Sequence, residues 1–293
     1  MTSRILIIAG SDSGGGAGVQ ADIKTVTMLG GFAMSAITAI TAQNTLGVQD
    51  VSLVDPDMVM AQMASCIEDI GVDAIKIGMV PTADCASAIG GMLLAARERL
   101  AISHGREARP YPVPVVVDPV IVATSGARLI DDAALDAICA RILPFATLMT
   151  PNLPELEALG GTERALAHGC ALLAKGGHAE GELVTDRLLT DAGEVARWDA
   201  PRIDTGSTHG TGCTFAAALA AGLAHGLELT AAARSAKRYV SAAIAAADSL
   251  WQELGTRPPG ASAEDGAPAT AAGHGPVHHF HALWPSPPSS LLP

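Results

Sequence analysis

The chain has 293 residues, of which 49% are hydrophobic, and its formal net charge is −12. This length and hydrophobic content suffice for one large α/β domain with an extensive core. Only 18 residues are Lys or Arg, which argues against the basic face that general nucleic-acid binding requires. We therefore expect a small-molecule partner and no nucleic acid.

The five cysteines are scattered, odd in number and without any C-x-x-C pair, so the sequence suggests neither a disulfide framework nor a zinc site. The apolar run near the N-terminus is too short for the apolar region of a signal peptide. The apolar stretch that follows Cys213 is interrupted by His225 and Gly226 before it could span a bilayer. We expect a cytoplasmic protein that makes no use of a membrane.

Short apolar runs alternate with longer Ala-rich or amphipathic stretches, as in parallel strands that are buried on both faces and covered by helices. In chain order, strands are expected at Ile5–Ala9, Ala36–Ala39, Ala74–Ile77, Val113–Val117, Thr147–Thr150 and Ala171–Ala174, with an edge strand at Leu183–Leu189. Helices are expected at Gly18–Leu29, Pro56–Ile70, Cys85–Arg99, Asp132–Leu143 and Thr214–Ala224, with one long final helix from Leu229 to about Leu254.

Three segments follow from the composition. Residues 1–254 are expected to form the domain, 255–273 a flexible insertion rich in Pro, Ala and Gly, and 274–293 a C-terminal tail. The tail carries the run Gly275–His281, which is dense in histidine. These histidines lack the fixed helical spacing of a metal motif, which argues against a metal site there.

A glycine-rich loop, Ala9–Gly18, follows the first predicted strand and opens the first helix. A dinucleotide-binding loop also needs an acidic residue at the end of the second strand, where this chain has Ile40–Gln43. The chain contains no Gly-Lys-Ser/Thr, so the Walker pattern is absent as well. Dinucleotide binding is therefore only a weak alternative.

Polar residues gather where predicted strands end, the place where doubly wound sheets bind ligands. The amide of Gln43 can donate and accept in one plane, as the edge of a heteroaromatic ring requires, although such residues also cap loops. Asp118, Asn152 and Glu155 could hold Mg²⁺ through oxygen ligands. The spacing of Asn152 and Glu155 equally fits a helix capping box.

The loop Thr208–Thr214 runs directly into an apolar helical stretch. Such a junction directs unpaired N–H groups and the positive end of a helix at one point, which suits a phosphate or an oxyanion. We expect this helix end to lower the pKa of Cys213 and to make it a general base or nucleophile, unless it is a small core residue. Lys175, followed by two glycines, is either a phosphate contact or a surface lysine.

Taken together, these motifs closely resemble the hydroxymethylpyrimidine and phosphomethylpyrimidine kinases of thiamine biosynthesis, which belong to the ribokinase-like superfamily. The resemblance covers nearly the whole chain except residues 256–273. The motifs that carry it are Ala9–Asp12, Gly14–Asp22, Ala42–Thr45, Lys76–Met79, Asp118–Val120, Thr150–Glu155, Lys175–His178, Thr208–Cys213 and Gly275–His281.

The resemblance implies an α/β fold, a central and mostly parallel sheet flanked by helices on both faces, with ATP and Mg²⁺ at its carboxyl edge. It implies phosphorylation of 4-amino-5-hydroxymethyl-2-methylpyrimidine and then of its monophosphate, by an enzyme that we expect to be a homodimer. It assigns pyrimidine binding to Gln43, Gly10, Asp22, Met79 and Val120, and the catalytic base to Cys213, with an anion hole at Gly210, Thr211 and Gly212. ATP phosphates would contact Lys175, Asn152 and Thr208, and the metal Asp118 and Glu155.

Two departures from the family pattern stand out. The chain is short between Glu155 and Lys175, where Glu163–Gly169 leaves too little room for a full helix, and Gly206 stands where many relatives have a lysine. The second phosphorylation is therefore the step that we expect to be affected. The alternatives are a pyridoxal or pyridoxine kinase of the same superfamily and a catalytically inactive regulator that binds a pyrimidine.

Overall fold

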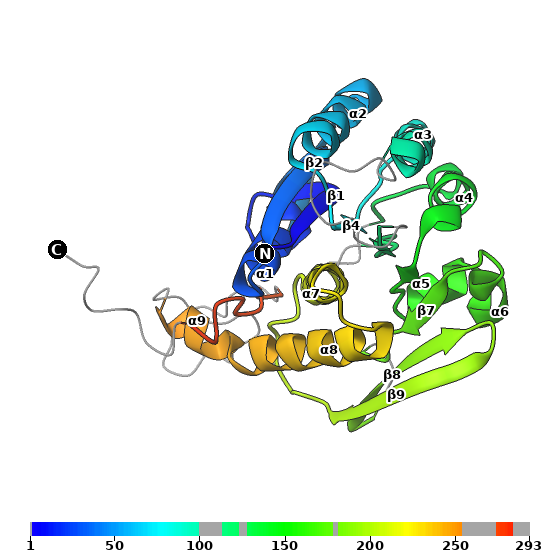
Figure 1. The fold of residues 1–293 in the computed structure, drawn as a ribbon. Helices are drawn as coiled ribbons and strands as arrows, with labels where there is room; N and C mark the ends of the chain where they lie inside the picture. The colour runs from blue at the N-terminus through cyan, green and yellow to red at the C-terminus, as the bar shows by residue number, and fades with distance from the viewer. Residues whose placement is uncertain (1, 100–112, 123–127, 178–180, 254–273, 284–293) are drawn as a thin grey trace.

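The computed structural model describes residues 2–99, 113–122, 128–177, 181–253 and 274–283. They form a single nine-stranded sheet with helices on both faces, as Figure 1 shows. The predicted α/β architecture, a mostly parallel sheet flanked by helices on both faces, is confirmed. Within the described residues, none of the helices combines the length and the hydropathy needed to cross a lipid bilayer.

The strands run in the order β3-β2-β1-β4-β5-β6-β7-β8-β9 across the sheet. Six neighbouring strands, β2, β1, β4, β5, β6 and β7, are parallel. β3 on one side of them and β8 and β9 on the other pair antiparallel. Their bounds are β1 Arg4–Asp12, β2 Phe32–Asn44, β3 Gly47–Leu53, β4 Ala74–Ile77, β5 Val115–Val117, β6 Leu148–Met149, β7 Ala171–Ala174, β8 Leu183–Thr190 and β9 Gly193–Pro201.

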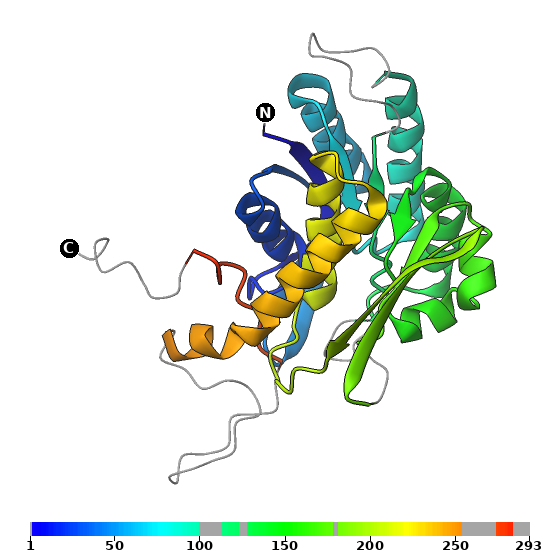
Figure 2. The same cartoon turned by 60° about the horizontal axis from the view of Figure 1, so that its bottom comes forward.

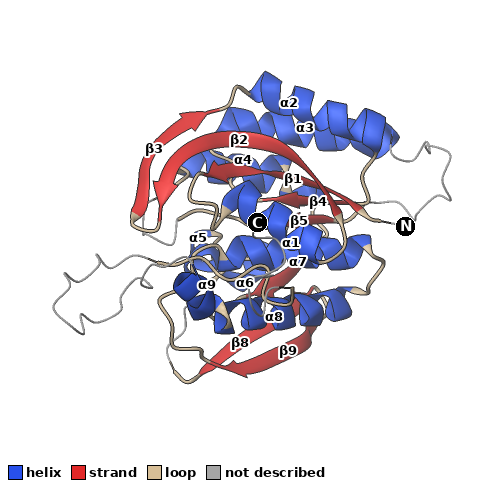
Figure 3. Ribbon diagram, turned by 90° about the vertical axis from the view of Figure 1, so that its left-hand side faces the viewer, coloured by secondary structure: helices blue, strands red, loops and turns tan. Residues whose placement is uncertain are grey.

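The helices form two layers, which Figures 2 and 3 show from other sides. One layer comprises α2 Pro56–Ser65, α3 Ala83–Arg99, α4 Asp132–Arg141, α5 Leu153–Ala158 and α6 Gly161–Leu166. The other comprises α1 Gly18–Met28, α7 Thr211–Ala224 and α8 Leu229–Ala245, after which α9 Ala247–Glu253 follows. A π-helical turn, Cys66–Ile70, extends α2, and a 3₁₀ turn, Leu143–Phe145, follows α4.

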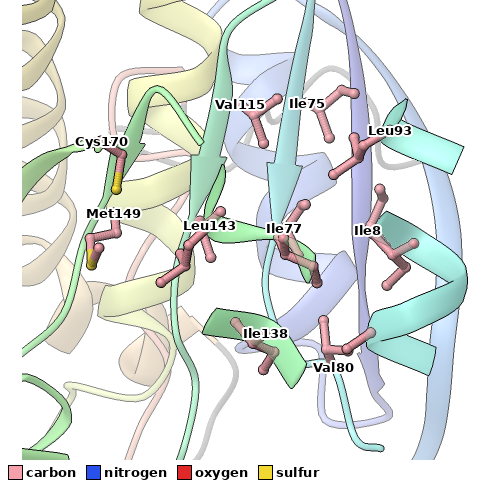
Figure 4. Close-up of a cluster of buried hydrophobic side chains, with 14 of the residues drawn as sticks. Ile8, Ile75, Ile77, Val80, Leu93, Val115, Ile138, Leu143, Met149 and Cys170 are labelled. Carbon is pink, nitrogen blue, oxygen red and sulfur yellow. The ribbon is translucent and has the colours of Figure 1, made fainter. Parts of the chain in front are cut away.

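The period of two along each strand divides the side chains between the two layers. In β1, Leu6 and Ile8 pack under the layer of α2 to α6, while Ile5 and Ile7 pack under α1 and α7. Figure 4 shows the first of these clusters, where side chains of several parallel strands meet those of the covering helices. Both faces are apolar because both are covered, which explains the continuous apolar runs in the sequence.

The seven predicted strands are present, but two further strands were missed. β3 and β9 pair only at the margins of the sheet, and most of their side chains are exposed, so neither carries an apolar run. The prediction that Leu183–Leu189 forms an edge is wrong, because β9 lies outside β8. β2 is also much longer than predicted, so that Gln43 and Asn44 belong to its end.

Several helix boundaries differ from the prediction. The final helix is not continuous, because Ala246 separates α8 from α9. Glu163–Gly169 forms no full helix, as predicted, but a six-residue helix, α6, begins two residues earlier and leads into β7 as placed. α7 begins at Thr211, three residues before the predicted start, so Cys213 lies inside the first turn.

The insertion 255–273 lies outside the described residues. Of the predicted tail, residues 274–283 are described, and they pack on the domain, with Val277 fully buried.

Candidate active site

The carboxyl ends of the parallel strands converge on the start of α7. Asp12 ends β1, Asp118 follows β5, and Lys175 follows β7. A Cβ built on Gly212, in the first turn of α7, would lie 3.3 Å from the Lys175 Nζ and 3.5 Å from the Asp118 Oδ2. The sheet edge and the helix N-terminus therefore face each other, as the sequence predicted.

Lys175 and Asp118 form an ion pair with 2.9 Å between Nζ and Oδ1. The Thr150 hydroxyl donates to the same Oδ1 at 2.9 Å. Burial alone would raise the pKa of Asp118, but the charges of Lys175 and Lys76 and these bonds hold it below its ordinary value. The pair thus supplies a fixed ammonium and a fixed carboxylate at the sheet edge. Lys175 is therefore not the loosely held surface lysine that was the alternative.

Asn152 and Glu155 form the capping box of α5. The Glu155 amide donates to Asn152 Oδ1 at 2.9 Å, and the Asn152 amide donates to Glu155 Oε2 at 2.8 Å. Burial, opposed by the charge of Lys175 and reinforced by that of Asp118, raises the pKa of Glu155 to about 7. The capping box that this spacing predicted is therefore present. It also holds a second carboxylate, that of Glu155, near Asp118.

The donor set at this point fits Mg²⁺. The described residues contain no cluster of three or more His, Cys, Asp or Glu side chains that could enclose a metal ion. Asp118 and Glu155 provide two carboxylates as possible ligands. This number is sufficient for Mg²⁺, which is commonly held by one or two carboxylates while it keeps several waters. A cation between the two would also relieve the repulsion that contributes to the raised pKa of Glu155.

A second ion pair lies beneath the first turn of α7. Lys76 of β4 and Asp22 of α1 are both completely buried, with 2.7 Å between Nζ and Oδ2. Burial alone would lower the pKa of Lys76, but the charge of Asp22 and of other nearby groups outweighs burial and raises it. The other carboxylate oxygen, Asp22 Oδ1, is buried and has no hydrogen-bond partner among the residues that the structure describes. Burial outweighs the Lys76 charge and raises the pKa of Asp22 to about 6.

Cys213 does not have the predicted ionisation. Its sulfur contacts the Gly18 amide and interacts electrostatically with Lys76, but burial is the largest effect and raises the pKa of the thiol to about 12. The expectation that the helix N-terminus would lower this pKa is wrong. Removal from water destabilises the thiolate more than the nearby positive groups stabilise it. The thiol is neutral at physiological pH.

Gly210 is the N-cap of α7, with φ of +79°, a left-handed conformation that only glycine adopts readily. The carbonyl of Gly210 accepts the Thr214 amide at 2.9 Å. The amides of Thr211, Gly212 and Cys213 belong to the first turn, where helices leave N–H groups without helical partners. Thr208 contributes its carbonyl, which accepts the Thr211 amide at 3.3 Å.

Gln43 meets a histidine that the sequence did not single out. His209 Nε2 lies 2.8 Å from Asp12 Oδ2 and 3.4 Å from Gln43 Nε2. The Asp12 carboxylate also accepts the amides of Gly14, Gly16 and Ala17. His209 Nε2 must therefore donate to Asp12, so it does not accept the amide protons of Gln43.

The remaining predicted pyrimidine contacts form a smaller group. A Cβ on Gly10 would come within 3.1 Å of the Met79 sulfur, so these two residues touch. The Met79 carbonyl accepts the Thr38 hydroxyl at 2.7 Å. Val120 stands two residues after Asp118, whose carbonyl accepts its amide at 2.8 Å.

Four residues of this arrangement had no predicted role: Lys76, Asp12, His209 and Thr150. A lysine inside the apolar run Ala74–Ile77 was the available signal, because a lysine in a strand that is buried on both faces needs a buried anion. Asp12 and His209 are separated by nearly two hundred residues, so nothing local indicated that they would pair.

Comparisons with known proteins agree with this geometry. Residues 12–257 match the family model described as phosphomethylpyrimidine kinase. A hydroxymethylpyrimidine/phosphomethylpyrimidine kinase of Rhizobium meliloti is 43% identical, over 97% of this chain and 99% of that protein. A thiamine biosynthesis bifunctional protein of Geobacter sulfurreducens is 41% identical, over 95% of this chain and 52% of the relative.

Solved structures show the same fold. Phosphomethylpyrimidine kinase from Clostridium difficile is 35% identical with a TM-score of 0.68, covering 83% of this chain and 100% of that one. Pyridoxal kinase from Staphylococcus aureus, in complex with AMP-PCP and pyridoxal, is 28% identical with a TM-score of 0.73, covering 98% and 96%. This chain is thus similar both to pyrimidine kinases and to a pyridoxal kinase.

Proposed function

This chain belongs to the phosphomethylpyrimidine kinase family, whose members are phosphotransferases, and we propose that it uses ATP to phosphorylate 4-amino-5-hydroxymethyl-2-methylpyrimidine and then its monophosphate. The relatives place this phosphorylation in thiamine biosynthesis. The observation that carries the proposal is the meeting of Lys175, Asp118 and the first turn of α7 at the carboxyl edge of the sheet. Phosphoryl transfer depends mainly on alignment and on neutralisation of charge.

Each part of the site has a proposed task. Lys175 holds phosphate oxygens, and the amides of Gly210 to Cys213 stabilise the charge that develops on the transferred group. Asn152 and Thr208 border the phosphates. Asp118 and Glu155 would hold Mg²⁺, which supplies charge neutralisation to the phosphates when it is bound.

The raised pKa of Cys213 changes the expected route of the proton. A group that is already ionised at neutral pH accepts a proton more readily than a neutral thiol does. Asp22, whose Oδ1 accepts no hydrogen bond from the described residues, is such a group. We propose that the substrate hydroxyl lies between Asp22 and Cys213, that Asp22 accepts its proton, and that the Cys213 sulfur orients it. Gln43, Gly10, Met79 and Val120 would surround the ring.

Mg²⁺ binding should depend on pH through Glu155. The folded-state pKa of Glu155 is raised to about 7, so its ionised form costs stability as pH rises through 7, and a bound cation offsets that cost. Mg²⁺ alone should therefore raise the Tm at pH 8 and much less at pH 6, since a ligand at 100 times its Kd stabilises by about 2.7 kcal/mol. Thermal unfolding with and without MgCl₂ measures this. Glu155→Gln should remove the difference, and an equal Tm shift at both pH values would contradict it.

Gln43→Ala should weaken pyrimidine binding by about 1–3 kcal/mol, the cost of leaving buried polar groups without partners. ATP affinity should be unchanged, because Gln43 lies on β2, away from Lys175. Calorimetric titration of the folded variant with the pyrimidine measures this effect. Gln49→Ala is the matched control, since Gln49 lies on the adjoining strand, β3, and its side chain donates to Asn44 and Gly47 of the same hairpin. An unchanged dissociation constant for the Gln43 variant would exclude it from the site.

The activity itself is tested by ADP release in a coupled assay, with hydroxymethylpyrimidine, its monophosphate and pyridoxal as separate substrates. We expect the pyrimidine to be preferred. Pyridoxal is the second candidate because of the similarity to the Staphylococcus aureus pyridoxal kinase in its pyridoxal complex. Preference for pyridoxal would reverse the assignment, and tight pyrimidine binding without ADP release would indicate an inactive regulator.

We further propose a cytoplasmic homodimer. Support comes from the hairpin of β2 and β3, where Ile40, Val51 and Leu53 are exposed on a sheet margin. Apolar side chains that gather on an exposed strand favour association with a second copy. Light scattering after size-exclusion chromatography should give twice the monomer mass of 29.6 kDa.

A further inference from the structure

The tail returns to the start of α7. Its residues Gly275–His279 are called here the C-terminal strap, drawn in red in Figures 1 and 2, where it lies between α1 and α8. Three consecutive strap residues, Val277, His278 and His279, are buried. The His278 amide donates to the Ala243 carbonyl of α8 at 3.0 Å. The strap is therefore packed between helices, and neither the fold nor the proposed chemistry has so far given it a task.

The strap holds the loop that precedes Cys213. The His209 amide donates to the Gly275 carbonyl at 2.9 Å, and the Gly275 amide donates to the Gly206 carbonyl at 3.1 Å. His209 and Pro276 form a parallel bridge. A Cβ on Gly16 would lie 2.9 Å from the Cβ of Pro276, so the glycine-rich loop touches the strap as well.

The strap also holds the helix turn that follows Cys213. The Thr214 hydroxyl donates its proton to the Gly210 carbonyl at 2.8 Å, so its oxygen must accept from His279 Nε2 at 3.1 Å. Burial, with the positive charge of Lys24 nearby, lowers the pKa of His279 to about 3, so the ring is neutral and carries one N–H. The Tyr239 hydroxyl donates to the His279 carbonyl at 2.7 Å and anchors the residue on α8.

We propose that the C-terminal strap is a positioning element of the phosphoryl-transfer site, with His279 as the positioning residue. The strap forms hydrogen bonds with the chain on both sides of Cys213, at His209 and at Thr214. These bonds fix the amides of Gly210 to Cys213 relative to the sheet edge. Displacement of such groups by about 1 Å lowers turnover strongly although the ligands still bind. The proposal rests on the proposed kinase function, because it concerns the alignment of the same anion hole.

The test compares His279→Leu, which removes the donor, with His279→Gln, whose amide places an N–H near the position of Nε2. With saturating pyrimidine, ATP and MgCl₂, His279→Leu should lower kcat by about 10- to 100-fold. Its KM for the pyrimidine should stay near the wild-type value, and His279→Gln should recover most of the turnover. Ser3→Ala is the matched control: it removes a buried hydrogen bond to the Ala224 carbonyl at the other end of α7 and should lower the Tm without changing kcat.

Normal kcat in folded His279→Leu would overturn the proposal, and so would a glutamine variant as poor as the leucine one. If His279→Leu does not fold, Tyr239→Phe releases the same residue from α8 and should still lower kcat several-fold; unchanged turnover there would also overturn it. Wild-type protein that binds ATP and the pyrimidine but releases no ADP would reject the proposed function instead. The two failures are therefore distinguishable.

Discussion

Lys76→Met should lower the free energy of unfolding by about 3–5 kcal/mol, the range for breaking a buried ion pair by removing one partner. Lys76 and Asp22 are fully buried and 2.7 Å apart. Loss of the ammonium leaves a carboxylate in the core, one oxygen of which already lacks a hydrogen-bond partner within the described part of the chain. Urea unfolding followed by circular dichroism measures the change, with the dependence on denaturant compared between variants.

Two further variants test that explanation. Arg187→Met removes a cation from the half-exposed pair with Glu194, and it should cost less than about 1 kcal/mol because water screens such pairs. Combining Lys76→Met with Asp22→Asn should restore part of the lost stability, because the unpaired charge is then removed. A Lys76→Met variant as stable as Arg187→Met would show that the buried pair is not a structural requirement.

Asp22→Asn should lower kcat by about 10²–10⁴, the range for the loss of a positioned acid–base group. In the wild type, kcat should rise with pH to a plateau, with a midpoint near the pKa of Asp22, about 6, because only the carboxylate accepts the proton. The pH–rate profile between pH 5 and 9, at saturating substrates, measures this dependence.

Cys213→Ser separates the two candidate bases. If the sulfur only orients the hydroxyl, serine should keep turnover within about tenfold of the wild type. If the thiolate is the base, the serine variant should be nearly inactive. Wild-type turnover should then keep rising across the whole pH range, because the pKa of the thiol is raised to about 12. That second pattern would exclude Asp22 as the acceptor and restore the assignment made from the sequence.

Buried elements could be predicted from the sequence because their signal is local. β4 and β7 were placed at their observed bounds, since each is a short run of four residues, apolar except for Lys76 in β4. β3 and β9 carried no such signal, because most of their side chains are exposed and form no apolar run. What places them in the sheet is their pairing with β2 and β8. The family motifs likewise placed Asp118, Lys175 and Gly212 at one edge, and the structure brings them together.

The ionisation of the site could not be read in this way. The position of Cys213 at a helix start predicted a lowered pKa, and this inference considered only the helix end. Burial under α1 and β4 reverses the sign, because the cost of desolvating a thiolate depends on everything packed around it. Lys76 and Asp22 show the same dependence, since each is tolerated in the core only through the other.

Residue types at short spacings were enough to predict the alternation of strands and helices, the glycine-rich loops and the family. The contact of Asp12 with His209, the ion pair of Lys76 with Asp22, and the contacts of the C-terminal strap on both sides of Cys213 became evident in the folded chain alone. These contacts join residues that are far apart in the chain. Their geometry and their charge states arise from packing and desolvation, which no local pattern of residues encodes.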